Sequence, residues 1–313
     1  MSGGVSDSRD HGAGCFQAVV DPFLGIEGLP FADVLSAARI EAVFARCGAL
    51  FGKHGVYSTA VTLWAFLSQV LRDGKEASCQ AAVARVVAYC RATGQPHPGH
   101  DTGVYCRARR KLSEDGLREL SRITAAELED RAEPEWLWKG RHAKLIDGFT
   151  FTMPDTAENQ AAFPQQKGQE PGVGQPIARA VAVLSLATAA VMDLELGPYQ
   201  GKESGETALL RSLMHHFGPD DIAVADRYYC SFMMIALLLN RGTQICARMH
   251  QGRHTDFRRG RRLGKYDHIV RWIRPQRPSW MSEELYQQIP ETLELREIRC
   301  SIVIPGRRTK CIT

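Results

Sequence analysis

Apolar and polar positions follow two different periods, which divide the chain into a helical part and a part with strands. Between residues 30 and 131, apolar residues recur three and four positions apart, the spacing of one helix face. Ser58 and Ser78 are predicted N-caps of two helices, and Gly74 and Gly94 follow their predicted ends. We therefore expect this segment to be all-helical.

The same segment contains a short predicted helix that is rich in arginine. Residues 101–111 read DTGVYCRARRK, with four basic residues among the last five. Tyr105 and Arg109 are four positions apart and should share a helix face. A basic helix fits the major groove of DNA and neutralises phosphates. The alternative is a solvated helix whose cations favour its C-terminal dipole end. A further helix is predicted over residues 115–131.

From residue 142 onward, short apolar runs bounded by turn-forming residues predict buried strands. The predicted order starts with a strand that begins near residue 142 and carries Asp147, followed by strands over 177–186 and 190–196 and a helix over 204–217. A strand over 222–225, a helix over 232–239 and a strand over 243–249 come next. The first three strands should pair antiparallel. This order predicts an α/β domain.

Two of these apolar runs end in a single aspartate. The runs KLID and IAVAD end at Asp147 and Asp226. Ligands of sheets flanked by helices sit at the carboxyl ends of strands, and Mg²⁺ prefers carboxylates together with phosphate oxygens. Two such aspartates from neighbouring strands would hold a divalent metal ion. The alternative is that each aspartate only caps a turn or the following helix.

The net charge of +4 is mild, but its distribution is uneven. Residues 241–280 carry eleven Arg or Lys and two Asp, a net charge of +9, so the remainder of the chain is net negative. Such asymmetry suggests that this segment binds a polyanion. The alternative is a solvated basic loop.

Aromatic residues interleave with the basic residues after His250, a combination that suits nucleic acid because flat rings stack on unpaired bases. Trp272 and Trp280 are the candidates for stacking, although each can equally be a core tryptophan of a small β-subdomain. Arg227 and Tyr228 follow Asp226 directly and could touch a phosphate. The residues expected to contact DNA are Tyr105, Arg107, Arg109, Arg110, Arg227, Tyr228, Arg258, Arg259, Arg261, Arg262, Lys265 and Trp272.

The nine cysteines contain no C-x-x-C pair and no zinc spacing, so buried free thiols in a reducing cytoplasm are expected. Residues 1–20 are polar, predicted to be disordered, and lack the apolar core of a secretory signal. The longest apolar run, residues 180–192, is too short to span a bilayer. These features predict a cytoplasmic protein without a membrane partner.

Three stretches together resemble the insertion-sequence DDE transposases of the IS-four family: LIDGFTFTMPDT, GPYQGKESGETALLRSL and AVADRYYCSF. Their order, and the 79 positions between Asp147 and Asp226, carry the resemblance. It implies a ribonuclease H-like fold after a helical DNA-binding domain. The implied boundaries are 21–140 for the helical domain, 141–249 for the catalytic domain and 250–313 for a basic β-rich insertion.

The resemblance also implies a site and partners. Asp147 and Asp226 would be the first two acidic residues of the triad, with Asp147 bridging two Mg²⁺ or Mn²⁺ ions and Asp226 holding one. The chemistry would be metal-dependent phosphodiester cleavage and strand transfer. The implied partners are duplex DNA at transposon ends and at the target, a dimer in the synaptic complex, and the nucleoid.

The third acidic residue of the family is a glutamate in a pattern like Tyr-x-x-Arg-x-x-x-Glu-x-x-x-x-x-x-Lys, which this sequence lacks. The five glutamates between Glu283 and Glu297 do not match it. The chain is therefore expected to be truncated and inactive alone. The alternatives are a non-catalytic DNA-binding regulator of transposition and an unrelated metal-dependent nuclease. A third carboxylate near Asp147 and Asp226 in the folded chain would favour an enzyme.

Overall fold

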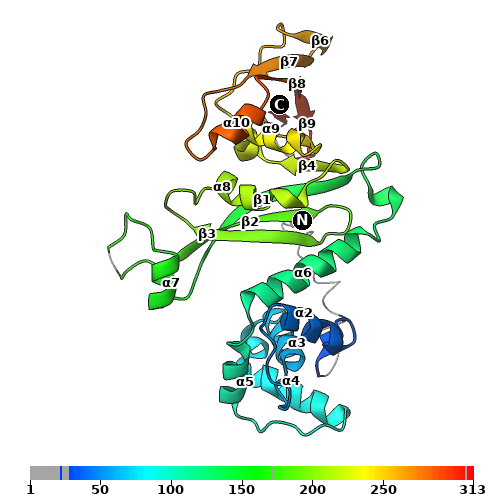
Figure 1. The fold of residues 1–313 in the computed structure, drawn as a ribbon, viewed down its shortest axis with the longest axis vertical. Helices are drawn as coiled ribbons and strands as arrows, with labels where there is room; N and C mark the ends of the chain where they lie inside the picture. The colour runs from blue at the N-terminus through cyan, green and yellow to red at the C-terminus, as the bar shows by residue number, and fades with distance from the viewer. Residues whose placement is uncertain (1–21, 23–27, 171, 307–308) are drawn as a thin grey trace, which may run out of the picture. The chain divides into compact units, whose positions relative to one another are not determined.

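A computed structural model describes Pro22 and residues 28–170, 172–306 and 309–313. The predicted disordered tail, residues 1–20, lies outside the described residues. The chain divides into two compact units, Met1–Leu120 and Ser121–Thr313. It is mixed α/β, with helices followed by a mixed sheet (Figure 1).

The first unit is helical, as the sequence predicts. The caps are confirmed: Ser58 Oγ accepts from the Val61 amide, and Ser78 Oγ from the Ala81 amide. Gly94, after the second of these helices, has a φ of 69°. The elements are η1 (Pro30–Ala32), α2 (Ala37–Arg46), α3 (Thr59–Val70), η2 (Gly74–Ala77), α4 (Cys79–Ala92), α5 (Thr102–Arg109) and the start of α6 (Glu114–Glu129).

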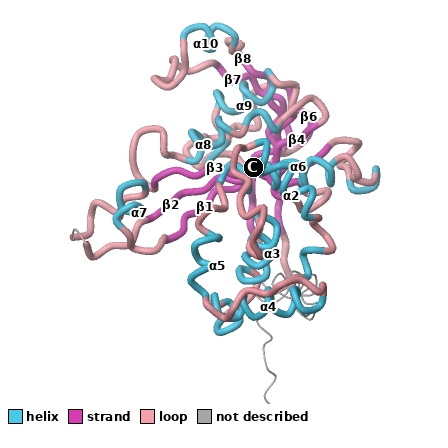
Figure 2. The backbone as a smooth tube through the Cα atoms, turned by 60° about the horizontal axis from the view of Figure 1, so that its bottom comes forward, coloured by secondary structure: helices cyan, strands magenta, loops and turns pink. Residues whose placement is uncertain are grey.

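The second unit is built on a five-stranded sheet in the order β3-β2-β1-β4-β5. The strands are β1 (His142–Thr152), β2 (Ile177–Ser185), β3 (Val191–Pro198), β4 (Asp221–Ala225) and β5 (Gln244–Ala247). The predicted antiparallel pairing of the first three strands is confirmed, and β1, β4 and β5 run parallel. Figure 2 shows β1, β2 and β3 side by side.

Two helices share the main core with this sheet. Helix α8 (Glu206–Ser212) packs on β2 and β3 through Leu209 and Leu210. The predicted helix over 204–217 is shorter than expected, because α8 ends at Ser212 and η4 (Met214–His216) follows. Helix α9 (Phe232–Asn240) is apolar all round, and its residues contribute to two core clusters. A helix of this kind is buried.

A smaller antiparallel sheet follows, in the order β6-β7-β8. Its strands are β6 (Arg261–Gly264), β7 (Asp267–Ile273) and β8 (Thr292–Ile298), and α10 (Glu283–Gln288) lies between the last two in sequence. The hairpin of β9 (Cys300–Ile302) and β10 (Lys310–Ile312) comes last. The remaining elements are η3 (Pro134–Trp136), η5 (Arg227–Tyr229) and the unpredicted α7 (Ala157–Ala162).

The eight described cysteines are free, as expected, but Cys246, Cys300 and Cys311 are exposed rather than buried. These three lie in the short strands β5, β9 and β10, in which no residue is buried. Within the described parts of the chain, no helix has both the length and the apolar character needed to cross a membrane.

A buried ion pair connects β1 to β4 next to their parallel pairing. Lys144 and Asp221 are 8% and 6% exposed, and Lys144 Nζ lies 2.8 Å from Asp221 Oδ2. Lys144 also donates to the His216 carbonyl at 2.6 Å, and the Gly218 amide donates to Asp221 at 2.7 Å. Both charges are therefore compensated by hydrogen bonds as well as by each other.

We expect Asp221→Ala to destabilise the protein by about 3–5 kcal/mol, because it leaves the Lys144 ammonium buried without its counter-ion. The measurement is chemical denaturation followed by circular dichroism. The double variant Lys144→Met with Asp221→Leu removes both charges and should regain most of this loss. A double variant as unstable as Asp221→Ala would contradict the explanation.

Candidate metal and nucleic-acid site

Asp147 and Asp226 stand at the same level of two neighbouring parallel strands. Ile146 pairs with Ala225, and Asp226 directly follows the end of β4. The sequence places Asp147 at the end of its strand too, but this is wrong, because β1 pairs with β2 as far as Thr152. Neighbouring strands lie about 4.8 Å apart. The apolar residues before the aspartates are in the core, whereas both aspartates are exposed. The structure thus brings together the two residues that the sequence singles out.

Each of the two carboxylates has one oxygen that is bonded to nearby backbone. The Gly148 amide donates to Asp147 Oδ1 at 2.9 Å, and the Tyr228 amide donates to Asp226 Oδ1 at 2.7 Å. The second bond is the capping role that the sequence allows as an alternative, since Asp226 is the N-cap of η5. Among the described residues, neither Oδ2 atom has a hydrogen bond or an ion-pair partner. One oxygen of each carboxylate is therefore available to a ligand.

A third carboxylate, which the sequence reasoning missed, lies beside this pair. Glu206, the first residue of α8, accepts a hydrogen bond from the Tyr229 hydroxyl at 3.1 Å. Burial raises the pKa of Tyr229, and so do the charges of Glu206, Asp147 and Asp226. All three carboxylates thus act electrostatically on one buried hydroxyl.

The contact between Glu206 and β1 depends on a glycine. A Cβ atom at Gly148 would lie 2.5 Å from Glu206 Cδ, closer than van der Waals contact allows. Gly148 follows Asp147 directly, so the glycine lets Glu206 approach the strand beside the aspartate. In the sequence, Glu206 resembles any acidic residue in the first turn of a helix; only the ESGE stretch quoted above marks its neighbourhood.

The donor set of three carboxylates suits a hard divalent cation such as Mg²⁺ or Mn²⁺. In the described part of the chain, no ion pair compensates Asp147, Asp226 or Glu206. The carboxylate oxygens of these three residues do not all lie within 4.8 Å of one another. Such spacing fits ligands that share an ion with waters or substrate oxygens, because Mg²⁺ usually keeps several waters.

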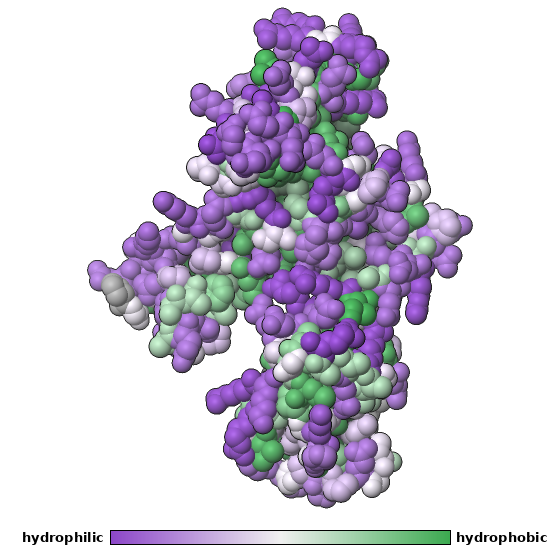
Figure 3. All heavy atoms as spheres, in the orientation of Figure 1, coloured by the Kyte–Doolittle hydropathy of each residue, from purple (hydrophilic) through white to green (hydrophobic). Residues whose placement is uncertain are grey.

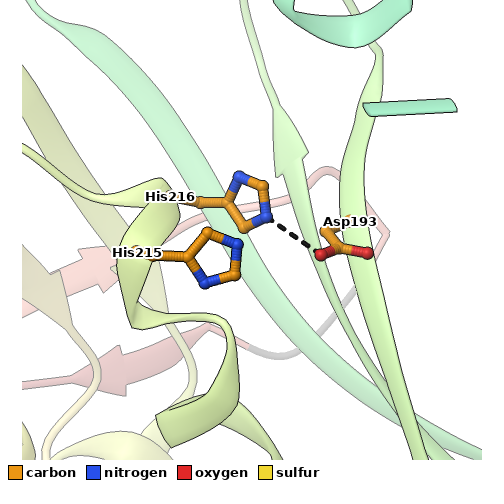
Figure 4. Close-up of side chains that lie close together, drawn as sticks. All are labelled: Asp193, His215 and His216. Atoms are coloured by element: carbon orange, nitrogen blue, oxygen red, sulfur yellow. Dashed lines mark hydrogen bonds and ion pairs between the residues drawn. The ribbon is translucent and has the colours of Figure 1, made fainter. Parts of the chain in front are cut away.

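The closer group consists of Asp193, His215 and His216, which Figure 4 shows facing one another. His216 Nε2 lies 3.0 Å from Asp193 Oδ2. Arg122 Nε donates to the same oxygen at 2.7 Å, and Arg122 Nη2 also bonds it. A guanidinium already supplies the positive charge that a metal would bring. We therefore assign this group to the packing of α6 on β3.

The protonation states of this group are set by burial and by its hydrogen bonds. Burial lowers the pKa of His216 and outweighs the opposing effect of Asp193, so the imidazole is neutral. Burial would raise the pKa of Asp193, but hydrogen bonds from Arg122, His216 and the Leu194 amide lower it overall. A neutral His216 that donates a hydrogen bond to an ionised Asp193 agrees with both pKa shifts.

We expect the free energy of unfolding to fall as the pH drops below 6.5, the ordinary pKa of histidine, because the unfolded state then binds a proton that folded His216 resists. A second loss follows below 3.8, as Asp193 protonates more readily in the unfolded chain. Denaturation as a function of pH measures both. His216→Gln should abolish the first loss, whereas the exposed neighbour variant His215→Gln should retain it; equal profiles would refute the assignment.

The four residues of α5 and its C-cap that are predicted to contact DNA differ in their exposure to solvent. Arg107 and Arg110 are exposed, and Arg109 is half-buried. Tyr105 is fully buried, and its hydroxyl donates to Gln69 Oε1 at 2.7 Å. Arg109 lies over the Tyr105 ring at 5.7 Å, which confirms that the two share a face. Tyr105 therefore holds α5 against α3 and offers no surface to DNA.

In the second unit, the basic residues around β6 are exposed. This set consists of Arg258, Arg259, Arg261, Arg262 and Lys265. Arg258 and Arg259 form ion pairs with Asp256 at 2.9 and 3.5 Å. On the face shown in Figure 3, hydrophilic side chains cover most of the region around β6, β7 and α10.

The remaining predicted contacts flank the carboxylates or lie in the core. Tyr228 is 50% exposed, and Arg227 Nη1 donates to Gln251 at 2.9 Å. Trp272 is 5% exposed, and its Nε1 donates to the buried Glu297 at 2.8 Å. Trp272 thus occupies the core position that the sequence left open as its alternative, and its buried ring is not free to stack on a base.

Comparison with known proteins finds one relevant similarity. The chain is 26% identical over 165 residues to the transposase InsG for insertion sequence element IS4 of Escherichia coli strain K12. These residues are 53% of this chain and 36% of that transposase, so the match spans little more than a third of the relative. No family model matches the chain.

Proposed function

We propose, from its similarity to a transposase of an insertion sequence, that the chain carries a metal-dependent DNA cleavage site of the DDE type. The observation that carries this proposal is the pairing of Ile146 with Ala225, which puts Asp147 and Asp226 side by side at the carboxyl end of β4. Strand ends in helix-flanked sheets are where ligands bind.

The topology supports a ribonuclease H-like fold. The element order β1, β2, β3, α8, β4, α9, β5 is the one that the resemblance implies. Three antiparallel strands followed by two parallel ones agree with it. The helical first unit precedes the five-stranded sheet in the sequence, and the basic β6 region follows it. Both would bind DNA.

Asp147 and Asp226 would hold the divalent ions, with Mg²⁺ or Mn²⁺ as the fitting ions, and Glu206 would be a third acidic residue close to them. Bound metal would polarise the phosphodiester and activate the attacking oxygen. The Oδ2 atoms of the two aspartates, which have no described partner, would be the ligand atoms. Tyr229 fixes the Glu206 carboxylate through its hydroxyl, and burial keeps this phenol protonated as a donor.

A second candidate function is a DNA-binding regulator of transposition that does not cleave. The observation that favours it is the set of exposed basic residues around β6, which suits DNA binding without any cleavage chemistry. The nearby Glu206 favours the enzyme instead, because a third carboxylate is then present. The two functions share the proposed partner, duplex DNA, and differ in chemistry alone.

The missing glutamate pattern predicts an inactive chain, but Glu206 supplies a third carboxylate near the two aspartates. We therefore expect the chain to nick a labelled transposon-end fragment with Mg²⁺ or Mn²⁺. Asp147→Asn and Asp226→Asn should lower the rate by more than about 100-fold, and Glu206→Gln by about 10–100-fold, the range for residues that support metal ligands. Electron paramagnetic resonance of Mn²⁺ should show weaker binding in the same variants. Glu203→Gln, in the loop just before α8, is the matched control and should leave both measurements unchanged.

Nicking at an unchanged rate in Asp147→Asn would contradict the assignment of Asp147 as a metal ligand. DNA binding without nicking in the wild-type chain would select the regulator instead.

We also expect salt-sensitive DNA binding by the β6 region. Arg261 and Arg262 are free of ion pairs with described carboxylates, unlike Arg258 and Arg259, so they should make the stronger phosphate contacts. Replacing both by Ala should make the log–log slope of affinity against salt less steep by about 1.8, or about 0.9 for each contact. Arg271→Ala with Arg277→Ala removes the same charge from arginines that pair with Glu294 and Glu283. An identical slope change in both variants would show that net charge alone matters.

A further inference from the structure

A basic cavity lies beside Asp226, since the next residue, Arg227, is part of its lining. It has a volume of about 280 Å³ and is open to solvent. Its charged lining consists of Arg227, Arg248, Arg253 and Arg299, with His250 and His254 beside them. Among the described residues, no acidic side chain lines it.

The four arginines lack the counter-ions that other arginines of the same unit have. Arg122, Arg211, Arg258 and Arg296, for example, each pair with a carboxylate. No described carboxylate forms an ion pair with any of the four that line the cavity. Like charges gathered in one place repel, and no described side chain of the cavity lining offsets them, so an anion from outside the chain would stabilise the cluster.

Neutral contacts hold these arginines around the cavity. Arg227 donates to Gln251, and Arg299 Nε lies 3.4 Å from Thr313 Oγ1. The guanidinium of Arg253 stacks on the Trp272 ring at 3.4 Å from its centroid. Because Trp272 is buried and hydrogen-bonded to Glu297, its ring holds the Arg253 guanidinium in a fixed position. Planar guanidinium groups fixed in this way suit the oxygens of a phosphate.

The backbone connects the cavity directly to the candidate metal site. Arg227 follows Asp226 in the chain. The Arg248 amide donates a hydrogen bond to the carbonyl of Ala225, the residue that precedes Asp226. The Gly252 amide donates to His250 Nδ1, which puts the proton of a neutral imidazole on Nε2. His250 Nε2 thus adds a hydrogen-bond donor to those of the arginines.

We propose that this cavity binds a backbone phosphate of a DNA strand whose neighbouring phosphodiester lies at Asp147 and Asp226. The inference rests on the proposed function and adds to it a phosphate site formed by Arg227, Arg248, Arg253 and Arg299. The cavity positions the strand through charge-assisted hydrogen bonds and carries no sequence information. A liquid water occupies about 30 Å³, so the cavity holds a phosphate group together with several waters.

Arg248→Gln is the clearest test, because the Arg248 side chain has no described contact with the core or with a carboxylate. Anisotropy of a fluorescein-labelled DNA strand in EDTA measures binding without metal. We expect Arg248→Gln to weaken it about tenfold or more, the effect of one charge-assisted hydrogen bond. Arg248→Lys should restore part of the affinity. Arg271→Gln, on exposed β7, removes equal charge and should change affinity by less than about twofold.

Strands with a single neutral methylphosphonate linkage locate the contact. One linkage should weaken binding to the wild-type chain but not further weaken binding to Arg248→Gln, since the partner is already lost. Equal losses in both proteins at every linkage, or equal effects of Arg248→Gln and Arg271→Gln, would overturn the proposal.

Calorimetry with inorganic phosphate alone distinguishes a free anion from DNA. Submillimolar phosphate binding that Arg248→Gln abolishes would overturn the DNA assignment in favour of a free-phosphate site. Mn²⁺ binding by the wild-type chain, measured separately, tests the proposed function. Its failure would leave the phosphate site standing, and failure of the methylphosphonate test would leave the metal site standing.

Discussion

The parallel pairing of β1 with β4 is the constraint on which the rest of the second unit depends. Parallel strands bury both faces, so the residues along their pairing are mostly apolar. The pairing of Ile146 with Ala225 places Asp147, in the middle of β1, beside Asp226, which follows the last residue of β4. The buried pair of Lys144 and Asp221 connects the same two strands near their other end.

Charge in this unit is separated by sign around the end of β4. Asp147, Asp226 and Glu206 gather near the Tyr229 hydroxyl, and all three raise its pKa. The arginines of the basic cavity begin at the next residue, Arg227. Neither group is paired with opposite charge among the residues described. A metal ion on one side and a phosphate on the other would satisfy both at once.

Fully satisfied buried polar groups have a different role from these unpaired ones. Arg122, Asp193 and His216 fix α6 to the main sheet. In the smaller sheet, Glu297 accepts from Trp272 and lies 3.0 Å from His268 Nε2. A buried network with all partners present rigidifies its surroundings, so both networks support neighbouring sites without taking part in their chemistry.

The sequence by itself determined the helices of the first unit, the strands of the second and the two aspartates, because apolar period and capping are local properties. Tertiary structure alone decided the roles of residues whose partners are distant in sequence. Glu206 approaches β1 beside Asp147 because Gly148 has no side chain there. The sequence predicts that Tyr105 and Trp272 contact DNA, but both are buried. Tyr105 is hydrogen-bonded to Gln69, 36 positions away, and Trp272 to Glu297, 25 positions away. Burial and long-range hydrogen bonding have no periodic signature, so no reading of local pattern could have separated these residues from the exposed ones.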